Sequence, residues 1–442
     1  MDLGRRPPVA ATDVAYRWVI LAFGILAYAT SQFARQNYTG VQKFIAADFQ
    51  LDKGALGLLG SAFFYSYALC QMPWGIASDR FGSRGVTALG ILLSAGAMAG
   101  FATSQSEAAL LFWRAMAGIA GAAVYVALTG GMARWFPREE RGFSQSTFGG
   151  VGGALGEAAA FFLLPVISIY LASGWRRGTN ILALGLAVMA VMCWTFLRSD
   201  PDPRQVEVKK PFEWRLLADP QLWCFALLFS AFIVGVRNVQ AWTAVYVTDV
   251  YIATRGFDVN AAVVTGGLLV TIAYSLCGRG LGVPMAGRVA DALFKRGWPR
   301  MVPVIAWLVL TIVLFQLLSM RVTEVWLLVV VAVLLGTAVN CFPLIAAAVS
   351  DTYGPQKTAS VMGFVNMVAQ LAGATSLAAS GYLGIALSGP GGNSLDEYQG
   401  IWLSGMGAIA LLTAMGAAIY VALRYRWVSH LTPPEQRATQ TL

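Results

Sequence analysis

The chain has 442 residues, of which 57% are hydrophobic and only 12% are charged, and its mean hydropathy is +0.63. These values exclude a soluble fold of this length, which would need far more polar surface, and they indicate a protein whose main solvent is lipid. The formal net charge of +9 does not indicate nucleic-acid binding, because the basic residues lie in loops between apolar runs and not in a patch with interleaved aromatic residues.

Apolar runs separated by glycine, proline or charged residues predict membrane-spanning helices, because about 20 residues in a helix cross about 30 Å of hydrocarbon. In chain order, the predicted spans are 17–38, 54–77, 85–104, 108–132, 143–170, 177–197, 221–248, 261–285, 301–319, 323–349, 358–386 and 400–424. Residues 198–220 carry prolines and mixed charges, which is typical of a solvated linker. The predicted fold is therefore an all-α membrane protein with twelve transmembrane helices in two pseudo-symmetric six-helix bundles, residues 1–197 and 221–442, the second ending in a short cytoplasmic tail.

Lysine and arginine residues are distributed unevenly, with twenty-one on one side of the predicted spans and six on the other. The positive-inside rule then places both termini and the linker in the cytoplasm, and a bacterial inner (plasma) membrane is expected. The first span is expected to be retained, because it lacks the exit of a cleaved signal peptide. The five cysteines lie in or beside apolar runs without paired spacing, and the single histidine, His430, follows the last span. We therefore predict no disulfide, no metal site and no cofactor.

A short charged hinge, residues 75–84, separates the second and third spans. Its Gly75, Asp79, Arg80 and Arg84 resemble the signature G-x-x-x-D-R-x-G-x-R/K of the major facilitator superfamily. The glycine is expected to let another helix pack closely where the second span leaves the bilayer.

Three further stretches support the resemblance. Residues 135–142 after the fourth span and residues 174–177 before the sixth span are similar to turns that are common in the family. A looser copy of the hinge, with Gly287, Arg288 and Asp291, lies in the second half. The resemblance implies that these two hinges gate transport by latching one conformational state; the alternative is that their charges only anchor the topology.

Five charged residues lie at membrane depth: Arg35, Arg114, Glu157, Arg237 and Arg279. Each costs about 2.5–3.5 kcal/mol near the centre of a spanning helix, so each is a candidate functional residue. Arginine grips carboxylates and phosphates with parallel hydrogen bonds, so several converging arginines indicate an anionic ligand.

Polar stripes on otherwise apolar helices indicate which faces line a cavity. The first span carries Tyr28, Ser31, Gln32 and Arg35 at helical spacing, and the seventh span carries a similar stripe that starts at Arg237. The resemblance is closest to organic-anion symporters and organophosphate antiporters, which implies that arginines of the first, fourth and seventh spans bind the anion or couple its movement. The predicted substrate-binding residues are Gln32, Arg35, Arg114, Arg237, Gln240, Asn366 and Gln370.

Glu157 has two interpretations: a proton carrier, or a fixed counter-ion in a buried pair with Arg114, which we favour slightly. The acids that related symporters often place beside the arginines of the first and fourth spans are replaced by Ala34 and Gly121, which departs from the coupling pattern of the family. The sequence leaves two roles open for Arg279: it lines the cavity, or it forms part of an inner gate.

The function predicted from the sequence is secondary active transport of a small organic anion, such as a carboxylate, sugar acid or organophosphate, by a monomer that works by alternating access and is coupled to a proton or sodium ion. The alternatives are a drug or metabolite exporter, an inorganic-anion porter of the nitrate/nitrite type, and a membrane sensor without net flux. An intramembrane enzyme is not predicted, because the spans contain no constellation of catalytic residues. The expected partners are the anionic solute, the coupled ion and the lipid bilayer, and no nucleic acid is expected to bind.

Overall fold

A computed structural model of the chain describes residues 11–136, 140–198, 214–341, 343–353, 355–389 and 394–431. Its elements before residue 199 are α1 (Ala11–Phe49), α2 (Lys53–Phe81), α3 (Ser83–Thr103), α4 (Glu107–Trp135), α5 (Arg141–Ala158), η1 (Ala159–Leu163), α6 (Leu164–Val166), η2 (Ile167–Leu171) and α7 (Trp175–Phe196). The later elements are η4 (Trp214–Ala218), α8 (Pro220–Arg255), α9 (Val259–Val270), η5 (Thr271–Gly282), α10 (Val283–Lys295), α11 (Met301–Ser319), α12 (Val325–Ala338), α13 (Pro343–Tyr353), α14 (Pro355–Ser388) and α15 (Ser394–Leu431).

The regular elements of the described ranges are helical, and ten of their helical segments are long and apolar enough to cross a membrane. The all-helical membrane fold predicted from the sequence is thereby confirmed. The other two predicted spans, 17–38 and 323–349, correspond to α1 and to α12 with α13. Buried polar side chains in the second half of α1 make it less apolar than a simple lipid-facing span.

The predicted span 323–349 is not one continuous helix, since α12 and α13 are separate. Pro343, the first residue of α13, has no N–H with which to continue the bond ladder of α12. Just before it, the side chain of Asn340 donates to the carbonyl of Gly336 at 2.9 Å and to the hydroxyl of Tyr274 at 3.3 Å. The prediction of one continuous span was wrong here because the apolar residues continue through a turn at which the helix ends.

Wide π-helical turns interrupt two of the spans: η1 and η2 follow α5, and η5 joins α9 to α10. Such turns occur frequently at functional sites because the extra residue redirects side chains. Glu157 lies just before η1, and Arg279 lies within η5. Arg279 is therefore presented from an irregular helical turn, and Glu157 lies immediately before one.

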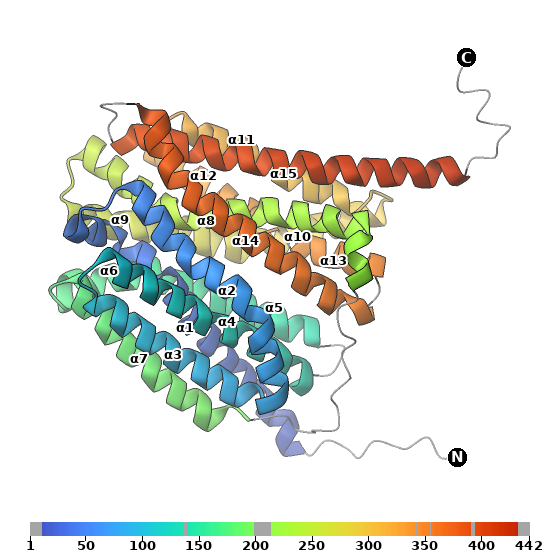
Figure 1. The fold of residues 1–442 in the computed structure, drawn as a ribbon, viewed down its shortest axis with the longest axis horizontal. Helices are drawn as coiled ribbons and strands as arrows, with labels where there is room; N and C mark the ends of the chain where they lie inside the picture. The colour runs from blue at the N-terminus through green and yellow to red at the C-terminus, as the bar shows by residue number, and fades with distance from the viewer. Residues whose placement is uncertain are drawn as a thin grey trace.

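In Figure 1, helices α1–α7 occupy the lower part of the view and α8–α15 the upper part, with α2 packed against α14 where they meet. The helix α5 also packs against η5, and α1 against α8. We call the end of the molecule with the α1–α2 and α8–α9 turns the outer end, on the left in Figure 1; α1 begins and α15 ends at the opposite, inner end.

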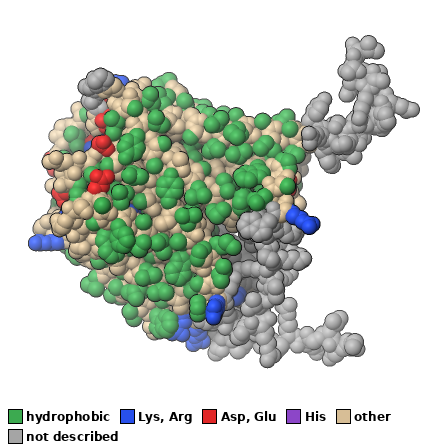
Figure 2. Space-filling model, viewed as in Figure 1, with side chains coloured by type: hydrophobic (Ala, Val, Ile, Leu, Met, Phe, Trp, Pro, Cys, Tyr) green, Lys and Arg blue, Asp and Glu red, His purple; other side chains and the backbone are tan. Residues whose placement is uncertain are grey.

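Figure 2 shows that hydrophobic side chains spread across the middle of the visible face, while the Lys, Arg, Asp and Glu side chains gather toward its edges. A belt of apolar surface between two charged rims is the arrangement that a bilayer requires.

Gly118 allows α4 to lie directly against α2. A Cβ atom on Gly118 would lie 2.1 Å from the backbone oxygen of Phe63 and 2.1 Å from the hydroxyl of Ser66, whereas a Cβ on Gly96 would meet nothing within 4 Å. Gly118→Ala is expected to lower the free energy of unfolding by about 1–3 kcal/mol through overpacking, while the control Gly96→Ala leaves it unchanged or raises it slightly. Thermal unfolding of the two purified variants checks this, and equal melting temperatures would contradict it.

Candidate anion site between the halves of the chain

Arg35 on α1 is a buried cation with two nitrogens that bond to no described residue. Its exposed fraction is 6%, and its Nε and Nη2 atoms are buried without a hydrogen-bond partner among the described residues. The guanidinium carbon lies 4.5 Å from the ring centre of Tyr67. On the same helix, Gln32 Oε1 and Gln36 Nε2 are also buried and unpartnered. A buried polar atom without a partner is expensive, and the unpartnered donors of Arg35 and Gln36 therefore favour the binding of an acceptor here.

Arg237 on α8 is the second buried cation, with an exposed fraction of 3%. Its Nη1 donates to Gln240 Oε1 at 2.7 Å and its Nη2 donates to Gln370 Oε1 at 2.9 Å. The guanidinium also stacks on Phe64, 4.0 Å from the ring centre. Both acceptors are neutral amides, and its Nε has no partner among the described residues. The positive charge is therefore solvated but not neutralised by these contacts.

Both guanidinium groups stack on aromatic side chains of α2. Arg35 stacks on Tyr67 and Phe63, Arg237 stacks on Phe64, and the rings of Phe63 and Phe64 are 5.3 Å apart. The structure thus brings together predicted site residues from the first, seventh and eleventh spans. It adds Phe64 and Tyr67, which the sequence analysis missed because aromatic residues in an apolar run look like ordinary core.

Arg114 is arranged differently from Arg35 and Arg237. Its three nitrogens donate to the carbonyls of Leu59 and Arg35 and to Asn37 Oδ1, each at 3.3 Å. These bonds tie α4 to α1 and α2 and hold the backbone of Arg35. In this arrangement Arg114 supports the backbone of the neighbouring arginine, and each of its three nitrogens already donates to the protein.

Glu157 pairs with Arg279 and not with Arg114, so the predicted Glu157–Arg114 pair was wrong. The carboxylate is fully buried; its Oε1 accepts from Arg279 Nη1 and from Gln240 Nε2, the latter at 2.6 Å, and its Oε2 has no described partner. The long side chain of Arg279 runs beside Gly153, where a Cβ would lie 2.8 Å from it. The absence of a side chain at Gly153 and the π-helical turn at η5 allow the cation to reach α5.

A second polar contact crosses from α14 to α2. Gln370 Nε2 donates to Asn366 Oδ1 at 3.2 Å, and Asn366 Nδ2 donates to Gln71 Oε1 at 2.9 Å. The amides predicted from the eleventh span therefore lie next to Arg237, and they connect it to Gln71, which the sequence analysis did not single out.

The hinge residues of the first half lie at the inner end of α2. A Cβ on Gly75 would lie 3.5 Å from a methyl group of Val126, an ordinary contact, so close packing does not require a glycine at this position in the observed arrangement. Arg80 stacks on Phe81, and Arg84 stacks on Trp194 with its guanidinium 4.6 Å from the ring centre.

The side chain of Asp79 lies outside the described residues. In the second half, Gly287 and Arg288 lie on α10, and a Cβ on Gly287 would meet nothing within 4 Å. Asp291 is 3.5 Å from Arg300, which also pairs with Asp351. The gating role of both hinges remains a prediction.

Charged residues at the outer end join the two parts of the chain. Lys43 of α1 pairs with Asp249 of α8, and Lys53 of α2 pairs with Glu397 of α15 at 2.8 Å. Tyr398 donates to Asp249 at 2.8 Å. The sequence analysis counted these lysines only among the six basic residues of one side. Two basic residues on one side facing two acidic residues on the other close this end of the interface.

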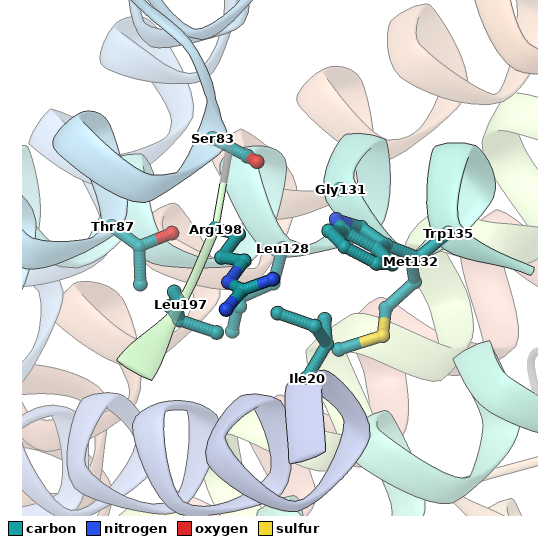
Figure 3. Close-up of a pocket in the computed structure, with 9 residues that line it drawn as sticks. All are labelled: Ile20, Ser83, Thr87, Leu128, Gly131, Met132, Trp135, Leu197 and Arg198. Carbon is teal, nitrogen blue, oxygen red and sulfur yellow. The ribbon is translucent and has the colours of Figure 1, made fainter. Parts of the chain in front are cut away.

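A small cavity lies at the inner end of α1, α3 and α4, away from the buried arginines (Figure 3). Ser83, Leu128, Trp135 and Arg198 are among its lining residues. Its volume is about 10 Å³, about the space of a single water molecule. It is too small for an organic solute, and the described residues contain no group of three or more potential metal ligands.

A family model for the Major Facilitator Superfamily matches residues 24–377 and, in a second match, residues 242–441. Among curated proteins, the probable galactarate/D-glucarate transporter GudP of Bacillus subtilis (strain 168) is 25% identical over 415 residues, covering 85% of this chain and 87% of the relative. The probable sulfoacetate transporter SauU of Cupriavidus necator is 25% identical over 63% of this chain and 66% of its own. The membrane sensor protein UhpC of Salmonella typhimurium is 26% identical over 64% of this chain and 67% of its own.

Among solved structures, a bacterial homologue of the human lysosomal transporter Spinster, in an inward-facing and unoccupied conformation, gives a TM-score of 0.73 at 17% identity, covering 98% of this chain and all of that one. The nucleoside transporter NupG gives a TM-score of 0.69 at 13% identity, covering 92% of this chain and 99% of the other. At these identities the likeness concerns the fold.

Proposed function

The chain belongs to the Major Facilitator Superfamily, a family of multi-pass membrane transporters and not of enzymes, and from this premise we propose that it carries a small organic anion across the membrane by alternating access. The candidate substrates are carboxylates, sugar acids and organophosphates. Relatives named as sugar-acid and sulfoacetate transporters support this class.

The proposed architecture is the one expected from the sequence: twelve spans in two bundles, residues 1–197 and 221–442, joined by a cytoplasmic linker, with both termini in the cytoplasm. Support comes from the ten apolar helical segments, from α1, and from α12 with α13 as the interrupted span. The uneven distribution of basic residues supports the orientation, and the bacterial relatives support an inner-membrane location.

The observation that carries the anion proposal is the pair Arg35 and Arg237. Each is more than nine-tenths buried, each keeps unpartnered nitrogens, and neither forms an ion pair among the described residues. Isolated buried charges are strongly unfavourable, so this arrangement is stable only when a negative group is available to it or water reaches it. An anion bound between α1 and α8 contacts both halves at once.

Alternating access follows from that placement. An anion held between both halves can leave only when the interface opens, and opening on one side at a time gives alternating access. At the outer end, the Lys43–Asp249 and Lys53–Glu397 pairs have to separate before the site can open outward. In our proposal the hinges containing Asp79 and Asp291 act in the same way at the inner end, and a proton or sodium ion is the coupling partner.

A membrane sensor is the second candidate, because the relative UhpC is named as a sensor and not as a transporter. A sensor would use the same arginines to bind an anion but would produce no net flux. Export of a drug or metabolite and inorganic-anion transport are further alternatives within the transporter class, and they differ in which solutes bind.

A thermal-shift screen of the purified protein tests the binding step. A carboxylate, sugar acid or phosphorylated sugar that binds the folded state should stabilise it by about 2.7 kcal/mol when present at 100 times its Kd. We expect a raised melting temperature with at least one of these organic anions. Stabilisation only by cationic or neutral compounds would contradict the anion proposal and favour an exporter, and stabilisation only by nitrate would favour an inorganic-anion porter.

A further inference from the structure

Gln240 contacts both the anion site and the buried ion pair between the halves. It lies one turn after Arg237 on α8; its Oε1 accepts from Arg237 and its Nε2 donates to Glu157 Oε1. The same carboxylate oxygen accepts from Arg279. One amide side chain is therefore the only described hydrogen-bonded connection between the guanidinium of Arg237 and the Glu157–Arg279 pair.

The direction of these bonds is fixed by chemistry. A guanidinium group only donates, so Gln240 has to turn its oxygen toward Arg237. Its NH₂ group then points to Glu157, which has to accept. Gln370 obeys the same constraint: its oxygen accepts from Arg237 and its NH₂ donates to Asn366, which in turn donates to Gln71.

Arg237 consequently orients two amide chains that both end on the other half of the chain. One chain ends at Glu157 on α5, and the other ends at Gln71 on α2. A carboxylate or phosphate is a stronger acceptor for a guanidinium than an amide oxygen is. An anion that reaches Arg237 therefore displaces the amide oxygens and removes the contact that orients each chain.

We propose that Gln240 and Gln370 are positioning residues which transmit the arrival of an anion at Arg237 to the two cross-links between the halves, at Glu157 and at Gln71. The inference rests on the proposed anion site. In this amide relay, a free Arg237 keeps both cross-links ordered and holds the outer end closed. An anion bound to Arg237 releases both cross-links. Because the anion binds more tightly to the conformation without these cross-links, it shifts the equilibrium toward that conformation.

The test measures the distance across the outer end without any ligand. Spin labels are placed at Ala47→Cys and Asn260→Cys, two exposed positions near the ends of α1 and α9, in full-length protein whose five native cysteines are replaced. Pulsed electron paramagnetic resonance then gives the ratio of closed to open molecules for each variant in detergent.

Gln240→Leu keeps the side-chain volume but removes both hydrogen bonds, and we expect it to lower the closed-to-open ratio about tenfold. Arg237→Gln removes the group that orients both amide chains and should lower the ratio at least as much as Gln240→Leu does. Because Arg237→Gln already releases the chain through Gln240, the double variant should be no more open than Arg237→Gln alone. The control Ser230→Ala, on the same helix, should match the parent protein.

The double variant Gln240→Glu with Glu157→Gln distinguishes loss of the hydrogen-bond chain from a folding defect. It restores an acceptor for Arg237 and a donor between α8 and α5, so it should recover the closed distance. A parent-like ratio for Gln240→Leu, additive effects in the double variant that contains Arg237→Gln, or an exchange of Gln240 and Glu157 that stays as open as Gln240→Leu would each overturn the relay. These arms contain no anion, so failure of the transport proposal would appear separately, as absent uptake by the parent protein.

Discussion

Replacing Arg237 with alanine is expected to abolish uptake of the anion while leaving the protein folded. The substitution removes a guanidinium that is 3% exposed and that contacts only neutral acceptors within the described chain. Truncating one partner of a buried, hydrogen-bonded charge pair costs about 2–5 kcal/mol, which corresponds to a loss of affinity of about thirtyfold to several thousandfold. The measurement is uptake into liposomes containing each purified variant, with protein quantity and monodispersity checked in parallel.

Arg237→Lys is the informative companion, because lysine keeps the charge but loses the planar fork that grips a carboxylate with two bonds. It should retain weak uptake. A second control is Arg321→Ala at the outer end, whose side chain is 51% exposed and should not affect uptake. Normal uptake by Arg237→Ala would remove the residue from the binding site, whatever the identity of the solute.

Arg279→Ala is expected to lower the free energy of unfolding by about 3–5 kcal/mol, because it leaves the carboxylate of Glu157 buried without its cation. Glu157 is completely buried, and of its described partners only Gln240 would remain. The additional change Glu157→Gln removes the stranded charge and should recover most of the loss. The measurement is thermal unfolding of the single and double variants in detergent.

The matched control for this experiment is the pair between Arg321, which is exposed, and Asp396, which is partly buried, at 2.8 Å. Arg321→Ala should change the free energy of unfolding by no more than about 1 kcal/mol, since solvent screens exposed pairs. If Arg279→Ala were as mild as Arg321→Ala, or if Glu157→Gln failed to recover its stability, Arg279 would not be the structural counter-ion of Glu157.

Much of the fold could be predicted from the sequence, because a chain in lipid has to satisfy its backbone hydrogen bonds within each span. The length of an apolar run is therefore enough to predict a spanning helix. The interruption near Asn340 could not be predicted by that rule. Hydrophobicity continues across the turn, and only Pro343, at the start of α13, gives a local signal of it.

The candidate site was predictable where a polar side chain stands out on an apolar helix. Arg35, Arg237 and Gln240 stood out in this way, and the structure gathers them. The partner of Glu157 was not predictable, because the choice between Arg114 and Arg279 depends on how α5 and the π-helical turn of η5 are aligned.

The ion pairs at the outer end escaped the sequence analysis for a related reason. Lys43 and Asp249 lie far apart in the sequence, and each alone is typical of a charged residue near a membrane surface. Only the packing of α1 against α8 places them together. Pairing between the two halves is a tertiary property, and a single sequence carries little information about it.

The most direct test of the account is uptake by the unmodified protein in liposomes, using labelled D-glucarate first and then the organic anion that gives the largest thermal shift. The account predicts saturable accumulation of an organic anion that stops when Arg237 is replaced with alanine. Tight binding of an organic anion without any flux would contradict transport and favour a sensor. Flux of neutral or cationic solutes that does not depend on Arg237 would contradict the anion site itself.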